Sequence, residues 1–397
     1  MLDKLELHIP FKREFLKTLN NGESFYIPVQ DLPDIELTSD IIRDDDGKLK
    51  IERLRTKFES LPSSHASMAC KVYDSGLNCD PFVAISCSPC KIVQGHNLFG
   101  FDCMEKSAKN MLWLLAYSFG DLYSMLDIEN TSVSQFDITY SSFVENEQTR
   151  LLLIDHLKNT AQGQTKNRGD AYASTSYFGS KNSRVKRLKV YLKHLEMVGA
   201  IKKARSRNQN VSADIMEGLL ETEFCRSAVR FEATIMRQYL ERRGVPANLF
   251  KLLKYIEETQ GFYTEMWQLA WSDVFKALSG QTVTNMNDDN IYNEIHKVHS
   301  TVSATGKITV VKVNRLFSFF QTMKTLGYDH LKKMTTASTF YRNVSDLLDC
   351  GFSKSFLQNL DKKSGCTVIP MTRMINIDFG SQFPENYVEA VDLWEAA

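Results

Sequence analysis

The chain has 397 residues, of which 43% are hydrophobic and 24% are charged, as in an ordinary folded globular protein. Lys and Arg number 48, as do Asp and Glu, so the formal net charge is zero and a histone-like basic coat is excluded. The longest apolar run, residues 111–117, is far shorter than the roughly 20 residues that span a bilayer, and the first residues lack a signal-peptide pattern. We therefore expect a cytoplasmic protein that does not enter membranes.

The first half of the chain alternates between strand and helix patterns. Leu5, Leu7 and Ile9 repeat every second residue and predict a strand over residues 1–10. The acidic stretch 31–46 has the turn chemistry of a surface loop. Further strands are expected at 66–74, 81–93, 132–140, 171–178 and 228–234, with helices at 104–126 and 147–162.

Cys87 and Cys90 form a C-x-x-C motif, which is found in zinc and redox sites. No second C-x-x-C and no histidine pair at zinc spacing accompanies it, and it lies in the apolar run 81–93. We therefore expect these two cysteines to be buried structural residues.

Two predicted strands each carry one carboxylate in the middle of an otherwise apolar segment. These are Asp137 in residues 132–140 and Glu232 in residues 228–234. Burying a carboxylate is costly unless it is paired or bound to a metal. One interpretation is a structural ion pair, for example of Glu232 with a nearby Arg; the other is an oxygen-ligand site for Mg²⁺ or Mn²⁺ on an antiparallel sheet.

Residues 181–207 are strongly basic, with ten Lys or Arg and a single acid, Glu196. Such a run is either a solvated surface or a strip that binds nucleic-acid phosphates. In the second case the residues expected to contact DNA are Arg184, Lys186, Arg187, Lys189, Lys202 and Lys203.

Tyr191 lies within this basic run and is flanked by cations. As a strand, residues 187–193 place Leu188, Val190 and Leu192 on one face and Tyr191 with the basic residues on the other; a helical pattern fits the segment equally well. Cations beside a tyrosine stabilise a phenolate and the charge on an attacked phosphate. Tyr191 is thus either a nucleophile or a packing residue.

After about residue 235 the pattern is helical, and the polar stretch 280–290 marks a boundary. We predict an α+β class, with an antiparallel-sheet core over residues 1–280 and a mostly helical region over residues 286–397. Within the latter, residues 335–360 read as two short helices joined at Gly351, capped at Thr335 or Ser338, which resemble a helix-turn-helix; an ordinary helical hairpin is the alternative.

Six ordered blocks resemble the gene II protein family, the replication initiators of filamentous bacteriophages, and the resemblance spans residues 1–390. The blocks are FESLPSSHASMACKVYDSG (58–76), SPCKIVQGHNLFG (88–100), DHLKNTAQGQTK (155–166), VYLKHLE (190–196), VRFEATI (229–235) and NIDFGSQFP (376–384).

The resemblance implies a nicking and joining endonuclease that starts rolling-circle replication. Such a protein binds the double-stranded phage origin, cuts the viral strand through a 5′-phosphotyrosine, leaves a 3′-hydroxyl primer and later circularises the displaced single strand. It implies Tyr191 as nucleophile with Lys193 beside it, and Mg²⁺ or Mn²⁺ held by Asp137 and Glu232, with Glu196 or His96 as further candidates.

The resemblance also implies partners and a second product. The partners are origin DNA, host helicase and polymerase, and several protomers on one origin, in the cytoplasm of a host bacterium. The second product starts at Met286, binds DNA and inhibits replication. The competing hypothesis is a non-enzymatic origin-binding protein that controls replication, in which Tyr191 packs in the core and the carboxylates are ion-paired.

Overall fold

The computed structural model describes residues 1–19, 24–43, 49–74, 80–144, 146–158, 161–162, 165–166, 174–278, 288–302, 308–352, 354–358, 360, 375 and 377–396. The predicted domain boundary at 280–286 and the internal start at Met286 lie outside these residues. Within them, no helix is long and apolar enough to cross a membrane.

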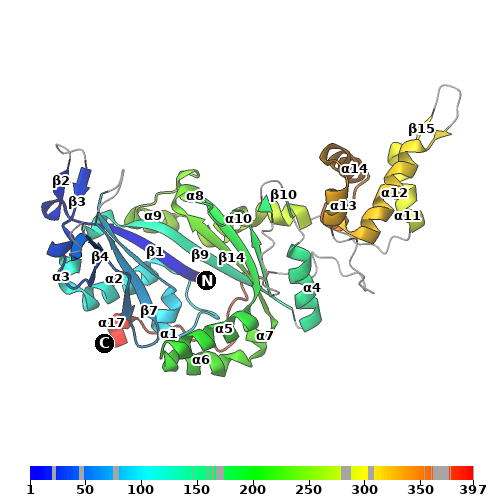
Figure 1. Ribbon diagram of the computed structural model, residues 1–397. Coiled ribbons are helices and arrows are strands. Elements are labelled where there is room, and N and C mark those ends of the chain that lie inside the picture. Colours follow the sequence, from blue (N-terminus) through cyan, green and yellow to red (C-terminus); the bar gives the residue numbers. More distant parts are fainter. Residues whose placement is uncertain are drawn as a thin grey trace.

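The centre of the molecule is one eight-stranded sheet in which all neighbouring strands are antiparallel, as predicted (Figure 1). In spatial order the strands are β12 (Thr175–Phe178), β13 (Lys186–Leu192), β14 (Ala228–Met236), β9 (Ser132–Phe143), β1 (Leu2–Pro10), β8 (Phe82–Cys87), β7 (Ser67–Tyr73) and β6 (Glu59–Pro62).

One face of this sheet is apolar and helix-covered, because successive strand residues point to opposite faces. Leu5, Leu7 and Ile9 are buried in the main core, as their spacing predicts, together with Leu188 and Phe231. The helices that complete this core are α2 (Met104–Ser118), α9 (Leu249–Glu258) and α10 (Phe262–Leu278).

Strand β1 contains a β-bulge near its start. Leu2 pairs with Ile138 and Lys4 pairs with Asp137, so Asp3 is the extra residue. Two residues of a bulged strand oppose one partner residue, which breaks the alternation. The bulge therefore brings Asp3 as well as Lys4 opposite Asp137.

A second group of helices follows β13 directly and has its own small apolar cluster, which includes Met197, Ile201 and Met216. It consists of α5 (Lys193–Ser206), α6 (Asn210–Leu220) and α7 (Glu223–Ser227). Figure 1 shows these helices together, apart from α9, α10 and the short α8 (Arg237–Glu241). The loop 95–100 behind α1 (Pro89–Gln94) joins this cluster through Leu98.

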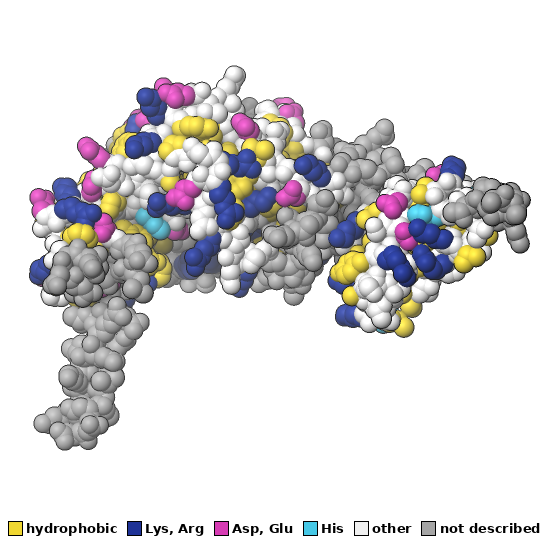
Figure 2. Space-filling view, turned by 90° about the horizontal axis from the view of Figure 1, so that it is seen from above, with side chains coloured by type: hydrophobic (Ala, Val, Ile, Leu, Met, Phe, Trp, Pro, Cys, Tyr) yellow, Lys and Arg dark blue, Asp and Glu magenta, His cyan; other side chains and the backbone are white. Residues whose placement is uncertain are grey.

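The C-terminal region is helical, as predicted, and packs around a separate hydrophobic core that includes Ile295, Leu316, Phe320 and Phe340. Figure 2 shows Lys and Arg side chains on the visible face of this part. Within this region Lys312 and Arg315 both pair with Asp346. Its helices are α11 (Asp288–His299), α12 (Val311–Leu326), α13 (Tyr328–Met334), α14 (Ala337–Asp349) and α15 (Lys354–Gln358).

The predicted helix pair at 335–360 corresponds to α14 and α15. Gly351 lies between them with φ +88°, a left-handed conformation that glycine adopts without a steric cost. The N-cap of α14 is Thr336, so the predicted caps Thr335 and Ser338 are wrong by one and two residues. Whether this pair binds DNA stays a prediction.

The last part of the chain returns to the sheet. Ile377 and Phe379 pack against the main core, and the Gln382 side chain accepts from the Ser141 backbone N–H at 2.7 Å and donates to its carbonyl at 3.1 Å. The backbone N–H of Leu393, at the start of α17 (Leu393–Ala396), donates to Asn110 on α2. These contacts attach residues 377–396, called the C-terminal tail below, to the core.

Several small elements complete the chain, and some predicted elements are wrong in part. The predicted strand 81–93 ends at Cys87, before helix α1, and the predicted helix 147–162 ends at Lys158. The predicted loop 31–46 contains strand β4 (Leu37–Arg43), which pairs with β5 (Leu49–Thr56), and the predicted helix 104–126 breaks at Phe119 before α3 (Gly120–Ser124). The other elements are β2 (Lys17–Leu19), β3 (Ser24–Tyr26), α4 (Glu147–Lys158), β10 (Ala161–Gln162), β11 (Thr165–Lys166), β15 (Thr301–Val302) and β16 (Ile308–Thr309).

Trp271 on α10 should be a large contributor to stability, since it is fully buried against Phe178, Phe231 and Phe275. We expect Trp271→Ala to lower the free energy of unfolding by about 4 kcal/mol, because it leaves a cavity in the main core. Urea unfolding would measure this. The partly exposed Trp113→Ala serves as control and should cost clearly less; equal costs would contradict the packing argument.

Candidate functional site

The face of the sheet opposite the main core carries the candidate residues. Directly paired residues of antiparallel strands project from the same face. Tyr191 pairs with Arg230 and Lys189 with Glu232, while Thr234 pairs with Asp137. The structure therefore places Tyr191, Glu232 and Asp137 on one polar face, on three adjacent strands.

Tyr191 lies on β13, one residue before the strand ends, so the strand interpretation of this segment is confirmed. Its side chain is only 2% exposed, and burial raises the pKa of the phenol well above its usual value, with the Glu232 charge adding to the increase. Arg230 opposes this effect and lowers the pKa, and the Lys189 Nζ lies 4.0 Å from the centre of the ring. The phenol is thus protonated in the free protein. The charges of Lys189 and Arg230 lie close enough to interact with a phenolate or with a phosphate.

Lys193, the first residue of α5, is fully buried, and its ammonium group has two hydrogen-bond partners. Its Nζ donates to Asn97 Oδ1 at 2.9 Å and to Glu196 Oε2 at 2.6 Å. Burial lowers its pKa to about 8, against the opposing effect of Glu196. Lys193 therefore joins α5 to the loop 95–100, whereas the cation that stacks on the Tyr191 ring is Lys189.

Glu196 is held ionised by this pair. Burial opposes its charge, but Lys193 and Lys91 outweigh burial and lower the pKa of the carboxyl to about 2. The carboxylate is the immediate partner of a buried ammonium group, and this makes it a structural counter-ion as well as a candidate metal ligand.

This pair predicts an acid-dependent stability. Because the folded-state pKa of Glu196 lies below the unfolded value, its stabilising effect is complete above about pH 4.5 and is lost as the pH falls toward 2. Glu196→Gln should destabilise the protein by about 3 kcal/mol at pH 6, because it leaves buried Lys193 uncompensated, and by much less near pH 2.5. Urea unfolding at both pH values would test this. The exposed Glu217→Gln, whose partner is Arg205, should change little at either pH; a loss that is the same at both would contradict the role of the charge.

Asp137 and Glu232 form a carboxylate pair that is only partly compensated. Asp137 is 8% exposed, its Oδ1 is buried without a hydrogen-bond partner, and burial and the Glu232 charge raise its pKa to about 8. Glu232 is paired with Lys189 at 3.5 Å, so an ion pair exists, but with a Lys where an Arg was expected. Asp137 has no such cation at hydrogen-bond distance among its described neighbours.

These two carboxylates fit a divalent cation. Mg²⁺ is commonly held by one or two carboxylates, with water and substrate phosphate filling the other positions. The unpartnered Oδ1 of Asp137 is the kind of hard oxygen ligand that such an ion prefers. Asp3 adds a third negative charge nearby, since it also raises the pKa of Asp137. In the described part of the chain, no group of three or more His, Cys, Asp or Glu side chains has the arrangement of a complete metal site.

His96 lies apart from this pair, in the buried loop 95–100. Its Nδ1 accepts from the Leu98 backbone N–H at 3.3 Å, so the proton of the neutral ring is on Nε2. Burial and the nearby charges of Lys193 and Arg230 lower its pKa to about 3. A protonated Nε2 is not available to a metal, and the geometry therefore favours Asp137 and Glu232 over His96 and Glu196 as ligands.

The six predicted DNA-binding residues do not share one surface. Arg187 and Lys189 lie on the polar face, whereas the Lys186 Nζ donates to the Ala270 carbonyl of α10 at 2.6 Å on the helix side. Arg184, in the loop before β13, and Lys202 and Lys203 on α5 are exposed. Lys186 is therefore removed from the face that carries Tyr191.

The structure adds three site residues that the sequence did not indicate. Asn97 Nδ2 donates to Asp3 Oδ1 at 2.7 Å, and its Oδ1 accepts from Lys193. The Arg230 guanidinium donates to the backbone carbonyls of Asn97, at 2.5 Å, and Leu98. Asp3, Asn97 and Arg230 thus tie β1, the loop 95–100 and β14 together around Tyr191 and Lys193.

Cys87 and Cys90 are both buried, and burial raises the pKa of each thiol, that of Cys90 to about 12. Thiols with raised pKa values are inert rather than catalytic. Their burial agrees with the structural role expected for them.

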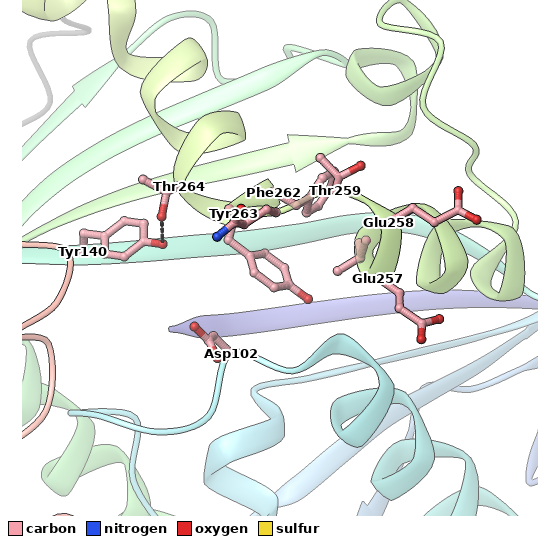
Figure 3. Close-up of a pocket in the computed structure, with 11 residues that line it drawn as sticks. Asp102, Tyr140, Glu257, Glu258, Thr259, Phe262, Tyr263 and Thr264 are labelled. Atoms are coloured by element: carbon pink, nitrogen blue, oxygen red, sulfur yellow. Dashed lines mark hydrogen bonds between the residues drawn. The ribbon is translucent and has the colours of Figure 1, made fainter.

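A cavity of about 490 Å³ lies elsewhere, on the helix-covered side of the sheet. The Tyr140 hydroxyl bonds to Thr264 at 3.0 Å there, and Asp102 and Tyr263 lie beside them (Figure 3). Tyr140 belongs to the main core, so this cavity is separated from Tyr191 by the sheet itself.

The comparisons with known proteins cover nearly the whole chain. Family models described as the N-terminal and C-terminal regions of the phage replication-associated protein, the gene II protein, match residues 1–260 and 302–393. The replication-associated protein of Salmonella phage IKe is 30% identical over 412 residues, 99% of this chain and 97% of the relative. Those of Enterobacteria phages M13 and f1 are each 33% identical over 410 residues, 98% of this chain and 99% of the relative. No solved structure matches the chain. The chain belongs to the gene II family of phage replication-associated proteins.

Proposed function

We propose that this protein starts rolling-circle replication of a phage genome by nicking one strand of the origin and later rejoining it. One observation carries this proposal: a tyrosine with stacked and paired cations lies on the same sheet face as a carboxylate pair, in a chain of the gene II replication protein family. That combination suits attack on a phosphodiester.

In the nicking step the Tyr191 oxygen attacks the scissile phosphorus. A phosphorus–oxygen bond to tyrosine forms and the bond to the 3′ oxygen breaks. The phenol loses its proton and the departing 3′ oxygen gains one, so the DNA is left with a 3′-hydroxyl and a 5′-phosphotyrosine. Lys189 and Arg230 stabilise the phenolate, and DNA binding must first give the phosphate access to the buried ring.

Asp137 and Glu232 would hold Mg²⁺ or Mn²⁺ beside Tyr191. When bound, the cation supplies a Lewis acid for the scissile phosphate. The protein residues then position the reacting groups. The side-chain amide of Asn97 donates to Asp3 and accepts from Lys193. These two bonds keep the loop 95–100 and α5 fixed relative to β1.

The joining step is the reverse reaction. A new 3′-hydroxyl attacks the phosphotyrosine, the bond to tyrosine breaks, and Tyr191 takes back a proton. The phosphotyrosine keeps the energy of the broken phosphodiester, and joining therefore needs no ATP. The displaced single strand leaves as a circle.

The wider setting follows from the same proposal. The protein acts on double-stranded origin DNA and the displaced strand in the cytoplasm of its bacterial host, with several protomers on one origin and with host helicase and polymerase. The shorter product from Met286 carries the helical C-terminal region, binds DNA through it and inhibits replication.

The test is a nicking assay on supercoiled plasmid that carries the cognate phage origin, with and without Mg²⁺. The proposal expects nicked circles and a protein band attached to the 5′-labelled end, both only with the metal. DNA binding without nicking in Mg²⁺ or Mn²⁺ would instead support the non-enzymatic origin-binding protein.

A further inference from the structure

A row of aromatic side chains lies on the polar face, on β8, β7 and the end of β1 that is far from Asp3. Phe82 stacks on His8, with ring centres 4.4 Å apart, and on Tyr73, at 4.7 Å. Phe58, just before β6, is 67% exposed, and the Lys71 Nζ lies 4.5 Å from its ring and 5.3 Å from that of Tyr73. We call His8, Phe58, Lys71, Tyr73 and Phe82 the aromatic platform.

The register places this platform on the same face as Tyr191. Tyr73 pairs with Phe82, and Lys71 and His8 both pair with Ala84 from their two sides. In the other direction Glu6, two residues from His8 on β1, pairs with Gln135, which shares its face with Asp137. The platform and the candidate site are therefore two parts of one continuous sheet surface.

Hydrogen bonds connect the two parts across the strands. His8 bonds to Glu6 at 3.1 Å, Gln135 Nε2 donates to Glu6 at 2.8 Å, and Arg187 donates to Gln135 Oε1 at 2.9 Å. The chain of bonds runs from β1 through β9 to β13, the strand of Tyr191. His8 on β1 lies three strand spacings of about 4.8 Å from β13. Tyr191 is level with Ser141 of β9, whereas His8 pairs with Ser132, so the two also differ by the length of strand between these residues, and the platform begins roughly 30 Å from Tyr191.

Stacked rings with an interleaved cation suit unpaired nucleic-acid bases. Every base has a flat π-face that stacks on an aromatic ring whatever its sequence, and a lysine between the rings meets the backbone phosphates. Because the net charge of the chain is zero, DNA binding must depend on local surfaces, and this platform is one to which single-stranded DNA can bind. A partner protein would gain little from three stacked rings on a polar sheet face, since protein interfaces have apolar, well-packed centres.

We propose that the aromatic platform binds the single-stranded flank of the DNA strand that is cut at Tyr191, by stacking of bases on exposed Phe58 and on the outer face of Tyr73. Phe82, which lies between the rings of His8 and Tyr73, supports Tyr73 from the other side. The inference rests on the proposed function for the identity of the strand. The platform holds bases several nucleotides away from the scissile phosphate and sets no sequence preference of its own. It keeps the strand on the sheet while the phosphate is at Tyr191.

The experiment measures binding of fluorescently labelled single-stranded oligonucleotides that span the nick site, by anisotropy, in a Tyr191→Phe background that cannot cut. The combined Phe82→Leu and Tyr73→Leu variant should bind at least about tenfold more weakly. Tyr117→Leu is the matched control, because Tyr117 is 76% exposed and stacked on Trp113 but lies on α2. Its affinity should equal that of the background protein.

Oligonucleotides with single abasic positions identify stacking directly. Removing a base that lies on the platform should weaken binding to the background protein and have no further effect on the platform variant. Phe58→Ala is a second variant. Because Phe58 is exposed and lies outside the strands, this change should not unfold the protein, and it still tests the inference if the double variant unfolds. It should weaken binding about fivefold.

The outcomes separate this inference from the proposed function. The inference is overturned if the platform variants bind DNA as tightly as the background protein. It is also overturned if abasic positions weaken binding equally in the background protein and in the platform variant. Either result holds even when the wild type nicks normally. A wild type that fails to nick, with platform-dependent binding intact, overturns the proposed function alone.

Discussion

Tyr191→Phe should abolish nicking and the attachment of protein to DNA, with a loss of at least about a thousandfold. The substitution removes one oxygen from a ring whose packing and contact with Lys189 are retained, so the fold and DNA binding should be unchanged. The measurement is conversion of supercoiled origin plasmid to nicked circles, together with the covalent band on a 5′-labelled end.

Tyr177→Phe is the matched control for this prediction. Tyr177 lies on β12 and pairs with Lys189, so it faces the same basic residue from the neighbouring strand. It should keep full activity. Equal nicking by the Tyr191 variant and the wild type would show that Tyr191 only packs; loss of nicking in the Tyr177 variant alone would move the nucleophile to β12.

Asp137→Asn should lower nicking at least about a hundredfold and, at the same time, raise the melting temperature of the metal-free protein. The activity falls because Asp137 is a proposed metal ligand, and the amide binds a divalent cation more weakly than a carboxylate. The stability rises because burial and Glu232 raise the pKa of Asp137 to about 8, so folding at neutral pH must protonate this carboxyl, and the neutral amide avoids that free-energy cost. The measurements are the plasmid assay and thermal unfolding with and without Mg²⁺.

Metal-dependent stability gives this prediction a readout other than activity. Mg²⁺ should raise the melting temperature of the wild type and leave that of the Asp137 variant unchanged, since a ligand that binds only the folded state stabilises it. The exposed Asp214→Asn on α6 should keep both the activity and the metal effect. An Asp137 variant that nicks normally, or a wild type that Mg²⁺ does not stabilise, would exclude the carboxylate pair as the metal site.

The ambiguity around Tyr191 shows what the sequence could and could not predict. Residues 187–192 alternate because they form β13, and Leu195 and Val198 continue a helical spacing because α5 starts at Lys193. The strand pattern ends at Leu192 and the helix pattern begins at Lys193, so the spacing of apolar residues across this boundary fits both. The alternation in residues 229–235, by contrast, continues through a whole strand and places Arg230, Glu232 and Thr234 on one face.

The residues that were missed depend on long-range geometry. Asp3 reaches the site through a β-bulge, and Asn97 reaches it because α1 and the loop behind it fold back onto β1 and α5. The only local signal was the polar pair Asp3 and Lys4 before the alternating Leu5, Leu7 and Ile9, which interrupts a strand pattern. Lys186 was expected to bind DNA but does not lie on the polar face. Because alternate residues of a strand point to opposite faces, its side chain reaches α10 on the helix side of the sheet.

The return of the C-terminal tail has a consequence for how the protein is made. The ribosome makes Gln382 and Leu393 after β1 and after the helices α11 to α15. The contacts of Gln382 with Ser141, and of Tyr387 with Phe99 in the loop of His96 and Asn97, therefore cannot form on a nascent chain. Only a chain synthesised through the C-terminal tail closes this part of the core, so a product that stops before the tail lacks these contacts with the sheet and with the loop 95–100.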